Sequence, residues 1–368
     1  MRRFFPQNFF FPQKTIYKVH GIETLAKETR SYGDQGLIVH GSSLERNGSL
    51  SDILKSFPNG TVTTFCRPQG EPTLKEVSAI LAKARAVNAE WIVGIGGGSV
   101  LDAAKAAAGL FHAEHEPQYY QEGGALEKRG IPFIAAPTTA GTGSEATPNS
   151  VITNTEKKAK LSIRDQSFLA KTVVLDGALL QHIPRAIFCY SAMDAYVQAY
   201  EAFVSRNATW ISDVFALKGL ALLNAHIEEA FKTKSSDDLE GMLLGSYFAG
   251  IALASARLGV IHGIAHPLGA LYDEPHGRIC AVCLLPSLKL NMSYIGHKYE
   301  VLSETVNQDF QSRVQDLIDL FSIESPFKNK PISEKQKIID ATLSSGSTAA
   351  NPKDITAHDV EQILGEIF

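Results

Sequence analysis

The stretch WIVGIGGGSVLDAAK, Trp91 to Lys105, decides the fold class of this chain. Its apolar run up to Ile95 predicts a buried strand, and the alanine-rich run after Ser99 predicts a helix. The glycines between them let backbone N–H groups approach an anion, because no Cβ intervenes and the helix dipole adds attraction. Ser99 stands where the last glycine of GxGxxG would be, so an ordinary tight turn stays an alternative. The stretch favours a strand, loop and helix that cradle a pyrophosphate.

The same alternation of strand and helix signals extends from Thr15 to about Pro184. This pattern predicts an α/β, Rossmann-like domain with a largely parallel sheet. After Pro184 the strand signal disappears and helix-period segments follow. We expect an α/β nucleotide-binding domain at residues 1–184 and an all-helical metal-binding domain at residues 185–368, with the active site in the cleft between them. The expected strands are 36–39, 91–95 and 132–136, and the expected helices are 74–88, 101–110, 186–204, 209–229, 238–256 and 299–321.

Charge, cysteine content and apolar runs indicate which binding partners and which cellular compartment to expect. The net charge of −4 is mild and no Lys/Arg block stands out, which argues against nucleic acid and anionic membranes and favours a small molecule. The four cysteines are few for 368 residues and indicate a reducing cytoplasm, with Cys280 and Cys283 interpreted as buried core. The basic, aromatic start at residues 1–6 is interpreted as mature sequence. The apolar run at 242–256 is interpreted as a buried helix, because it is too short to cross a bilayer.

A second loop has the same position relative to a strand as the glycine loop. Thr138, Thr139 and Thr142 follow the strand predicted at residues 132–136 and offer hydroxyls and flexible backbone toward the same edge of the sheet. Two such loops after two strands together predict a nucleotide site more specifically than either loop alone.

Candidate metal ligands lie in the second half. Asp194 and Gln198 are four residues apart on an expected helix and share a face, and so do His262 and His266. Either pair alone fits an ordinary hydrogen-bonded face. Adding His276, however, gives three histidines in an apolar context with few local acids. Asp and His are ligands that hold Zn²⁺ or Fe²⁺ with one position open for a substrate oxygen.

Four motifs together resemble the iron-containing (group III) alcohol dehydrogenase family, over nearly the whole chain. They are GGGSVLDAAK at Gly96–Lys105, PTTAGTGSEATPNSVIT at Pro137–Thr153, MDAYVQAYEAFVS at Met193–Ser205 and HGIAHPLGALYDEPHG at His262–Gly277. The resemblance implies a metal held at Asp194, Gln198, His262 and His276, and a non-ligand histidine, His266, that helps to pass the proton near the nicotinamide. Gln198 stands where the family has a histidine, and its neutral amide is a weaker ligand than imidazole.

The resemblance also implies the nucleotide contacts. Gly97, Gly98, Ser99 and Asp102 match pyrophosphate contacts, Thr138, Thr139 and Thr142 match the second loop, and Asn149, Lys160 and Leu180 match positions that line the ribose and nicotinamide. Relatives that prefer NAD place an Asp at the end of the second strand, where this chain has Gly41. We therefore expect NADP(H) to be favoured, with NAD(H) left open. Gly41, Ser42, Ser43 and Arg46 would surround the 2′-phosphate.

These features predict a cytoplasmic, NAD(P)-linked alcohol dehydrogenase or aldehyde reductase that uses Fe²⁺ or Zn²⁺, as a homodimer. Arg164, Arg257 and Arg278 leave open a small anionic aldehyde of the phosphono, sulfo or carboxy type, although each is better explained singly as an exposed or salt-bridged arginine. Two other functions stay open: a sugar-phosphate cyclase or lyase of the dehydroquinate-synthase type, and a metal-free nucleotide-binding protein without turnover.

Overall fold

The structure, a computed structural model, describes residue 6 and residues 8–157 and 159–368. Most of the start interpreted above as mature sequence lies outside these residues. The chain divides into two compact units. One contains Phe10–Ile183 and Lys234–Leu244, and the other contains Pro184–Thr233 and Gly245–Phe368.

The first unit is built on a parallel sheet, as its sequence predicts. In the described part of the chain six strands lie in the order β1-β8-β5-β4-β2-β3, and every neighbouring pair is parallel. Every residue of β4 and β5 is buried, which explains their unbroken apolar sequences. The strands are β1 (Lys14–Tyr17), β2 (Gly36–Gly41), β3 (Val62–Arg67), β4 (Trp91–Gly96), β5 (Phe133–Pro137) and β8 (Thr172–Leu175), and a separate antiparallel pair is formed by β6 (Asn149–Asn154) and β7 (Ala159–Arg164).

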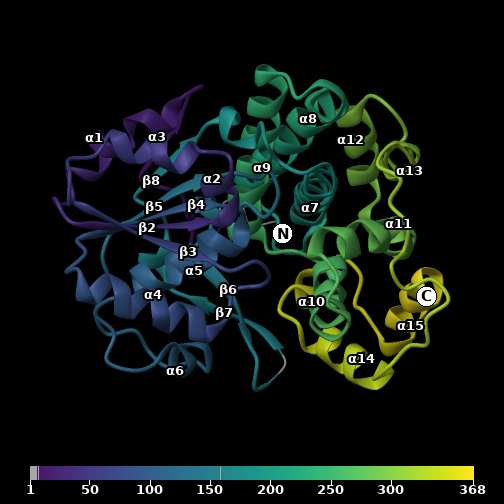
Figure 1. Cartoon of the computed structure of the whole chain (residues 1–368). Coiled ribbons are helices and arrows are strands. Elements are labelled where there is room, and N and C mark those ends of the chain that lie inside the picture. The colour runs from purple at the N-terminus through teal and green to yellow at the C-terminus, as the bar shows by residue number, and fades with distance from the viewer. Residues whose placement is uncertain (1–5, 7, 158) are drawn as a thin grey trace. The chain divides into compact units, whose positions relative to one another are not determined.

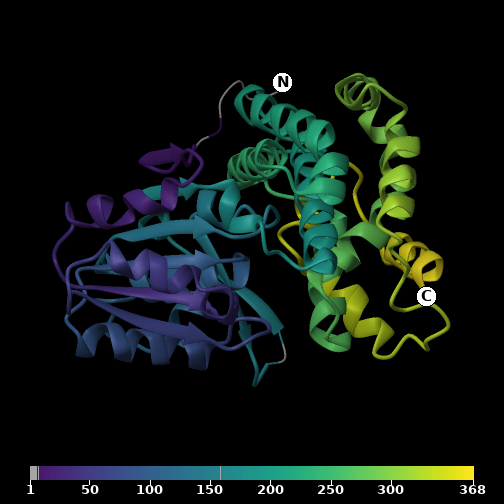
Figure 2. The same ribbon diagram turned by 45° about the horizontal axis from the view of Figure 1, so that its top comes forward.

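Helices cover both faces of this sheet (Figures 1 and 2), with α1 and α3 on one side and α4 and α6 on the other. Helix α4 begins at a capping box, in which the Thr73 hydroxyl accepts the Glu76 N–H and the Glu76 carboxylate accepts the Thr73 N–H. Helix α5 is buried along almost its whole length, and its small alanine side chains allow the neighbouring elements to pack closely on all its sides. The helices are α1 (Leu25–Thr29), α2 (Ser42–Arg46), α3 (Ser49–Lys55), α4 (Leu74–Ala86), α5 (Gly98–Gly109) and α6 (Pro117–Gln121), with 3-10 turns η1 (Gly21–Thr24), η2 (Ser144–Ala146), η3 (Gln166–Phe168) and η4 (Gly177–Leu180).

The second unit is helical, as predicted, and α7 lies at its centre against α8 and α11. Helix α9 (Ser236–Ala256) begins in the first unit and continues into the second. It is longer than the run at 242–256 suggested and is long and apolar enough to cross a membrane, but 72% of its most apolar window is buried inside the protein, as in a core helix. The elements are α7 (Arg185–Val204), α8 (Trp210–Thr233), α9 (Ser236–Ala256), α10 (Val260–Tyr272), α11 (His276–Ile295), α12 (His297–Val306), α13 (Phe310–Leu320), α14 (Lys335–Ser344), η5 (Thr348–Ala350) and α15 (Ala357–Ile367).

One expected helix is wrong. The segment 299–321 forms two helices, because α12 ends at Asn307 in the left-handed conformation, with φ 55°. A new helix then begins at Asp309, whose carboxylate accepts the Ser312 N–H at 2.9 Å. Asn is tolerated in the left-handed region and Asp is a favoured N-cap. The sequence therefore contains a signal that ends α12 and a signal that begins α13.

Candidate metal centre and nucleotide edge

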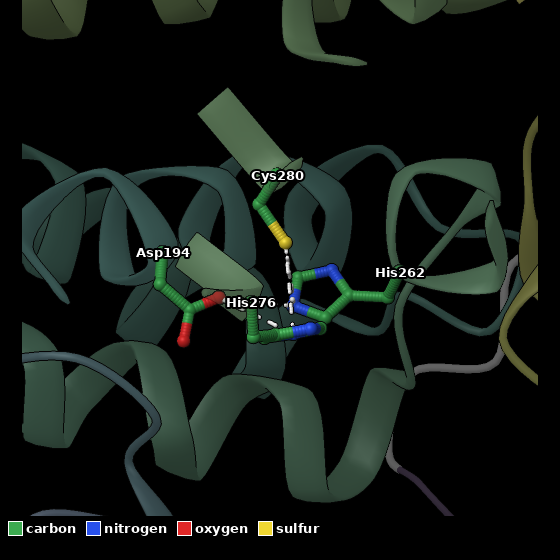
Figure 3. Close-up of side chains that lie close together, drawn as sticks. All are labelled: Asp194, His262, His276 and Cys280. Atoms are coloured by element: carbon green, nitrogen blue, oxygen red, sulfur yellow. Dashed lines mark hydrogen bonds and ion pairs between the residues drawn. The ribbon is translucent and has the colours of Figure 1, made fainter. Parts of the chain in front are cut away.

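Three helices of the second unit bring the candidate metal ligands together (Figure 3). Helix α7 supplies Asp194, α10 supplies His262, and α11 begins at His276 and carries Cys280 one turn later. Asp194 and His262 are almost completely buried, at 3% and 2% exposed, and Cys280 is fully buried. The structure therefore brings together Asp194, His262 and His276 of the predicted ligands and adds Cys280, which the sequence assigns to the core. The fourth predicted ligand, Gln198, contacts the Asp194 carboxylate.

The four donor atoms lie within 4.8 Å of one another. His262 Nε2 and His276 Nε2 are 3.3 and 3.7 Å from Asp194 Oδ1. Cys280 Sγ is 3.6 Å from His276 Nε2 and 4.0 Å from His262 Nε2. Donors held about 2.0–2.3 Å from a tetrahedral ion are themselves roughly 3.3–3.7 Å apart. Three of these separations lie in that range, and the fourth, from Cys280 Sγ to His262 Nε2, is longer, so one divalent cation fits with a small inward movement of the sulfur.

Two buried oxygens support this fit. Asp194 Oδ1 and Gln198 Oε1 lack a hydrogen-bond partner among the described residues. Buried acceptors are normally paired, and an ion is one explanation for an unpaired one. Burial opposes the ionisation of Asp194, but the neighbouring His262 and His276 hold the pKa of its carboxyl below the usual value. An ionised carboxylate is the form that binds a metal.

Glu201 orients His262, and the sequence reasoning missed it. Its Oε2 is 2.6 Å from His262 Nδ1, and its Oε1 accepts the Ile261 N–H at 2.7 Å. With Nδ1–H donating to Glu201, the lone pair of Nε2 faces Asp194 and the other donors. Such outer carboxylates fix the tautomer of metal-binding histidines. The spacing of Asp194, Gln198 and Glu201 on one face of α7 was the available signal.

His266 lies beside the cluster without joining it. Its ring stacks on that of His276, with centroids 5.3 Å apart and planes 13° apart. It lies one turn after His262 on α10, as the spacing predicted, and is partly exposed. The ring is therefore close to the donors and reachable from solvent.

Asn351 holds the start of α10 in place. Its Oδ1 accepts the Val260 N–H at 3.2 Å, and its amide donates to Asn291 Oδ1 at 2.8 Å. This buried network connects α10 and α11, the two helices that carry the histidines. The Asn-Pro near the end of the chain thus has a structural role in placing the site.

The predicted nucleotide-binding loops meet at one edge of the sheet in the first unit. Gly41, Gly97 and Thr138 lie at the carboxyl ends of the parallel strands β2, β4 and β5, and Thr138 donates its N–H to the Gly96 carbonyl at 3.0 Å. A Cβ at Gly98 would lie 2.5 Å from Thr142 Oγ1. Only glycine therefore fits at this position, so the backbone N–H groups at the start of α5 are not covered by a side chain at Gly98. Open α/β sheets bind ligands at this place.

Some residues carried over from the family have structural partners here. Asp102 accepts the Ser144 hydroxyl at 2.5 Å and the Val151 N–H at 3.2 Å. Burial raises the pKa of its carboxyl, although the nearby Lys105 opposes the shift. Lys160 pairs with Glu71 at 2.8 Å, and Leu180 is fully buried.

The remaining residues predicted to bind the nucleotide lie in β6, α2, α5 and the loop after β5. Asn149 begins β6, and its side-chain oxygen is buried without a partner among the described residues. Ser42 and Ser43 open α2, where Arg46 donates to the Ser42 hydroxyl at 2.6 Å. Ser99 and Thr139 are partly exposed beside the glycine loop. Hydroxyl, amide and guanidinium groups are thus available at this edge.

The arginines considered for substrate binding differ. Arg278 is held by the Glu274 carboxylate at 3.2 Å and by the Glu324 carbonyl at 3.1 Å, which supports the salt-bridge interpretation. Arg257 is exposed after the end of α9, with φ 62°. Arg164 is exposed at the end of β7.

Comparison with known proteins places this geometry in a family. The family description "Iron-containing alcohol dehydrogenase" matches residues 12–177, and "Fe-containing alcohol dehydrogenase family, C-terminal" matches residues 188–368. The chain is 27% identical to an NAD-dependent methanol dehydrogenase of Bacillus methanolicus, covering 97% of this chain and 98% of that protein. It is 28% identical to a sulfoacetaldehyde reductase of Bilophila wadsworthia, covering 83% and 80%.

A solved structure of a 1,3-propanediol oxidoreductase aligns with a TM-score of 0.92 and 26% identity, covering 98% of this chain and 99% of that one. Both halves of the sequence, the parallel sheet and the helical unit agree with these matches. The chain belongs to the iron-containing alcohol dehydrogenase family.

Proposed function

We propose that this protein is a metal-dependent, nicotinamide-linked alcohol dehydrogenase or aldehyde reductase for a small substrate. The observation that carries the proposal is the convergence of Asp194, His262 and His276 from three helices on a volume that fits one divalent cation. Family membership supports oxidoreductase chemistry on a carbon that bears a hydroxyl.

When bound, the cation would polarise the oxygen of an aldehyde or alcohol, and the nicotinamide would exchange a hydride with the carbon. The residues of the chain supply the rest. Glu201 holds His262 in the tautomer whose Nε2 faces the donors. His266, stacked on His276 and partly exposed, would carry the proton between the substrate oxygen and solvent.

The preferred cofactor in this proposal is NADP(H). Gly41 leaves the end of β2 without a carboxylate, and Arg46 and Ser42 stand at the start of α2. An arginine and hydroxyls fit a 2′-phosphate, whereas an Asp at Gly41 would repel it. The NAD-dependent relative from Bacillus methanolicus stands against this preference, so both cofactors belong in the test.

A small anionic aldehyde is the substrate class to test first. The similarity to a sulfoacetaldehyde reductase favours it, and the exposed Arg257 offers a positive charge in the unit that carries the metal cluster. Neutral short aldehydes are the matched comparison, because they differ only in the charge.

The deciding experiment follows nicotinamide absorbance with the metal-loaded protein, NADPH or NADH, and paired anionic and neutral aldehydes. Steady consumption of reduced cofactor that depends on the aldehyde and on added metal supports the proposal. A cyclase or lyase of the dehydroquinate-synthase type would regenerate its cofactor in each turnover and show no steady change. Nucleotide binding with no metal and no turnover would support the metal-free alternative.

A further inference from the structure

The cysteine in the metal cluster is the least expected feature of the site. Cys280 is fully buried one turn after His276, and its Sγ points between the Nε2 atoms of His276 and His262 (Figure 3), at 3.6 and 4.0 Å. Cys283, three residues later on α11, is equally buried but does not belong to the donor cluster. Burial alone therefore does not explain why Cys280 faces the ligands.

The position of Gln198 makes this cysteine informative. The amide of Gln198 is a neutral and weak ligand where the family pattern has an imidazole, so Asp194, His262 and His276 alone would leave the ion short of one strong donor. A thiolate on the neighbouring helix supplies a donor with a full negative charge. Asp194 Oδ1, which is buried and lacks a hydrogen-bond partner among the described residues, lies in the same cluster.

We propose that Cys280 is the fourth ligand and that the metal centre of this protein is Asp194, His262, His276 and Cys280, with Gln198 outside the ligand set. This inference rests on the proposed function only in assuming that the site holds a metal. The amide of Gln198 then hydrogen-bonds the carboxylate of Asp194. Its Oε1, which is buried without a hydrogen-bond partner among the described residues, is the donor that competes with the thiolate for the ion.

A thiolate ligand changes which ion the site prefers. Zn²⁺ already binds nitrogen and oxygen donors more tightly than Fe²⁺ does, and a soft sulfur donor should widen that preference. The number of ligands stays the same as in the family pattern, because this chain lacks the imidazole on α7 and has a thiolate on α11 instead. We therefore expect this protein to retain zinc more firmly than iron.

The test is cobalt substitution, because a thiolate bound to Co²⁺ gives an intense charge-transfer band in the near ultraviolet that nitrogen and oxygen ligands do not give. The full chain carries Cys66→Ser throughout, since Cys66 lies near His40 and Glu45 in a second group of possible ligands. One equivalent of Co²⁺ is added without oxygen and the spectrum is recorded. We expect the band at one cobalt per chain.

Two further variants assign the band. Cys280→Ser should lose it and release zinc to a competing chelator at least about tenfold more readily, while Cys283→Ala should keep both the band and the zinc. Gln198→Ala should keep the band as well. Retention of the band in Cys280→Ser would overturn the assignment.

The cobalt spectrum of the protein with Cys280 in place also tests the proposal by itself, so the test does not depend on whether a variant folds. Stoichiometric cobalt without the band would overturn the thiolate ligand and leave the proposed oxidoreductase untouched. Failure to bind cobalt at all would overturn the thiolate ligand together with the metal requirement of the proposed function.

Discussion

The two candidate sites of this protein, the predicted nucleotide edge and the predicted metal centre, are built in opposite ways. The nucleotide edge consists of backbone: glycines and loop N–H groups at the ends of neighbouring parallel strands, where a Cβ at Gly98 would collide with Thr142. The metal cluster consists of side chains, which α7, α10 and α11 bring together across 87 positions from Asp194 to Cys280. Adding side-chain atoms at Gly98 should disrupt the nucleotide edge, whereas removing side-chain atoms should disrupt the metal centre.

The largest expected effect comes from removing atoms at the metal cluster. His276→Ala deletes one of the four converging donors and leaves Asp194, His262 and Cys280 to hold the ion. We expect the metal and the turnover to be lost together, while NADPH binding by the first unit persists. Metal analysis and nucleotide titration of the same sample measure both.

The matched control is His297→Ala, because His297 is an exposed histidine at the start of α12, with its side chain 81% exposed. It should change neither metal content nor turnover. Full metal content in His276→Ala would show that the ligand assignment is wrong.

The same contrast explains what could be predicted from sequence. The glycine loop is contiguous, so the run from Trp91 to Lys105 was enough to indicate strand, loop and helix, and β4 and α5 confirm it. Glu201 and Cys280 were missed, because their meaning depends on which face of one helix packs against another. Cys280 was expected to be buried, which it is, but its sequence neighbours do not reveal the histidines across from it.

Two strands and one helix break are not predicted by the sequence, for a different reason. The strands β1 and β8 have only four residues each, too few to show a clear alternation of apolar and polar side chains. They pair with each other in the sheet although they are far apart in sequence. The break at Asn307 was overlooked because apolar periodicity continues on both sides of it. Local stop and start signals outweighed the longer pattern.

A buried acid is an exception within the backbone-built region. Glu145 follows the threonine loop, and burial raises the pKa of its carboxyl to about 7 although Lys105 is near. A folded-state pKa above the unfolded value means that stability is unaffected below about pH 4.5 and is lost as pH rises toward 7. The full penalty is about 3 kcal/mol, from the shift between 4.5 and about 7.

Glu145→Gln should remove that penalty, so we expect the variant to gain stability over the parent as pH rises from 5 to 8. Denaturant unfolding at a series of pH values measures the difference. Glu156→Gln, at an exposed position whose carboxylate carries no such burial, is the control and should follow the parent at every pH. A constant difference between Glu145→Gln and the parent would contradict the buried-acid explanation.

His266 tests whether a group beside the cluster acts separately from the ligands. His266→Ala leaves the four donor atoms in place, so metal content and NADPH affinity should stay near those of the parent. Turnover should fall roughly a hundredfold, the usual contribution of general acid–base catalysis. Loss of metal in step with turnover would instead make His266 part of the ligand framework, and unchanged turnover would remove it from the mechanism.

The smallest expected effect concerns Gly41, where adding atoms should change selectivity without breaking the fold. A Cβ there would lie 3.7 Å from Val100 Cγ2 and 3.8 Å from Ser43 Oγ, which is ordinary contact, in contrast to the collision at Gly98. Gly41→Asp should repel a 2′-phosphate and offer a ribose hydrogen bond, shifting the ratio of kcat/KM for NADPH and NADH toward NADH by about tenfold, or about 1.4 kcal/mol. Gly41→Ala adds the carbon without the charge and should leave the ratio unchanged. A parent that uses NADH alone would show that Gly41 does not set the cofactor preference, and an equal shift in both variants would mean that shape rather than charge controls this edge.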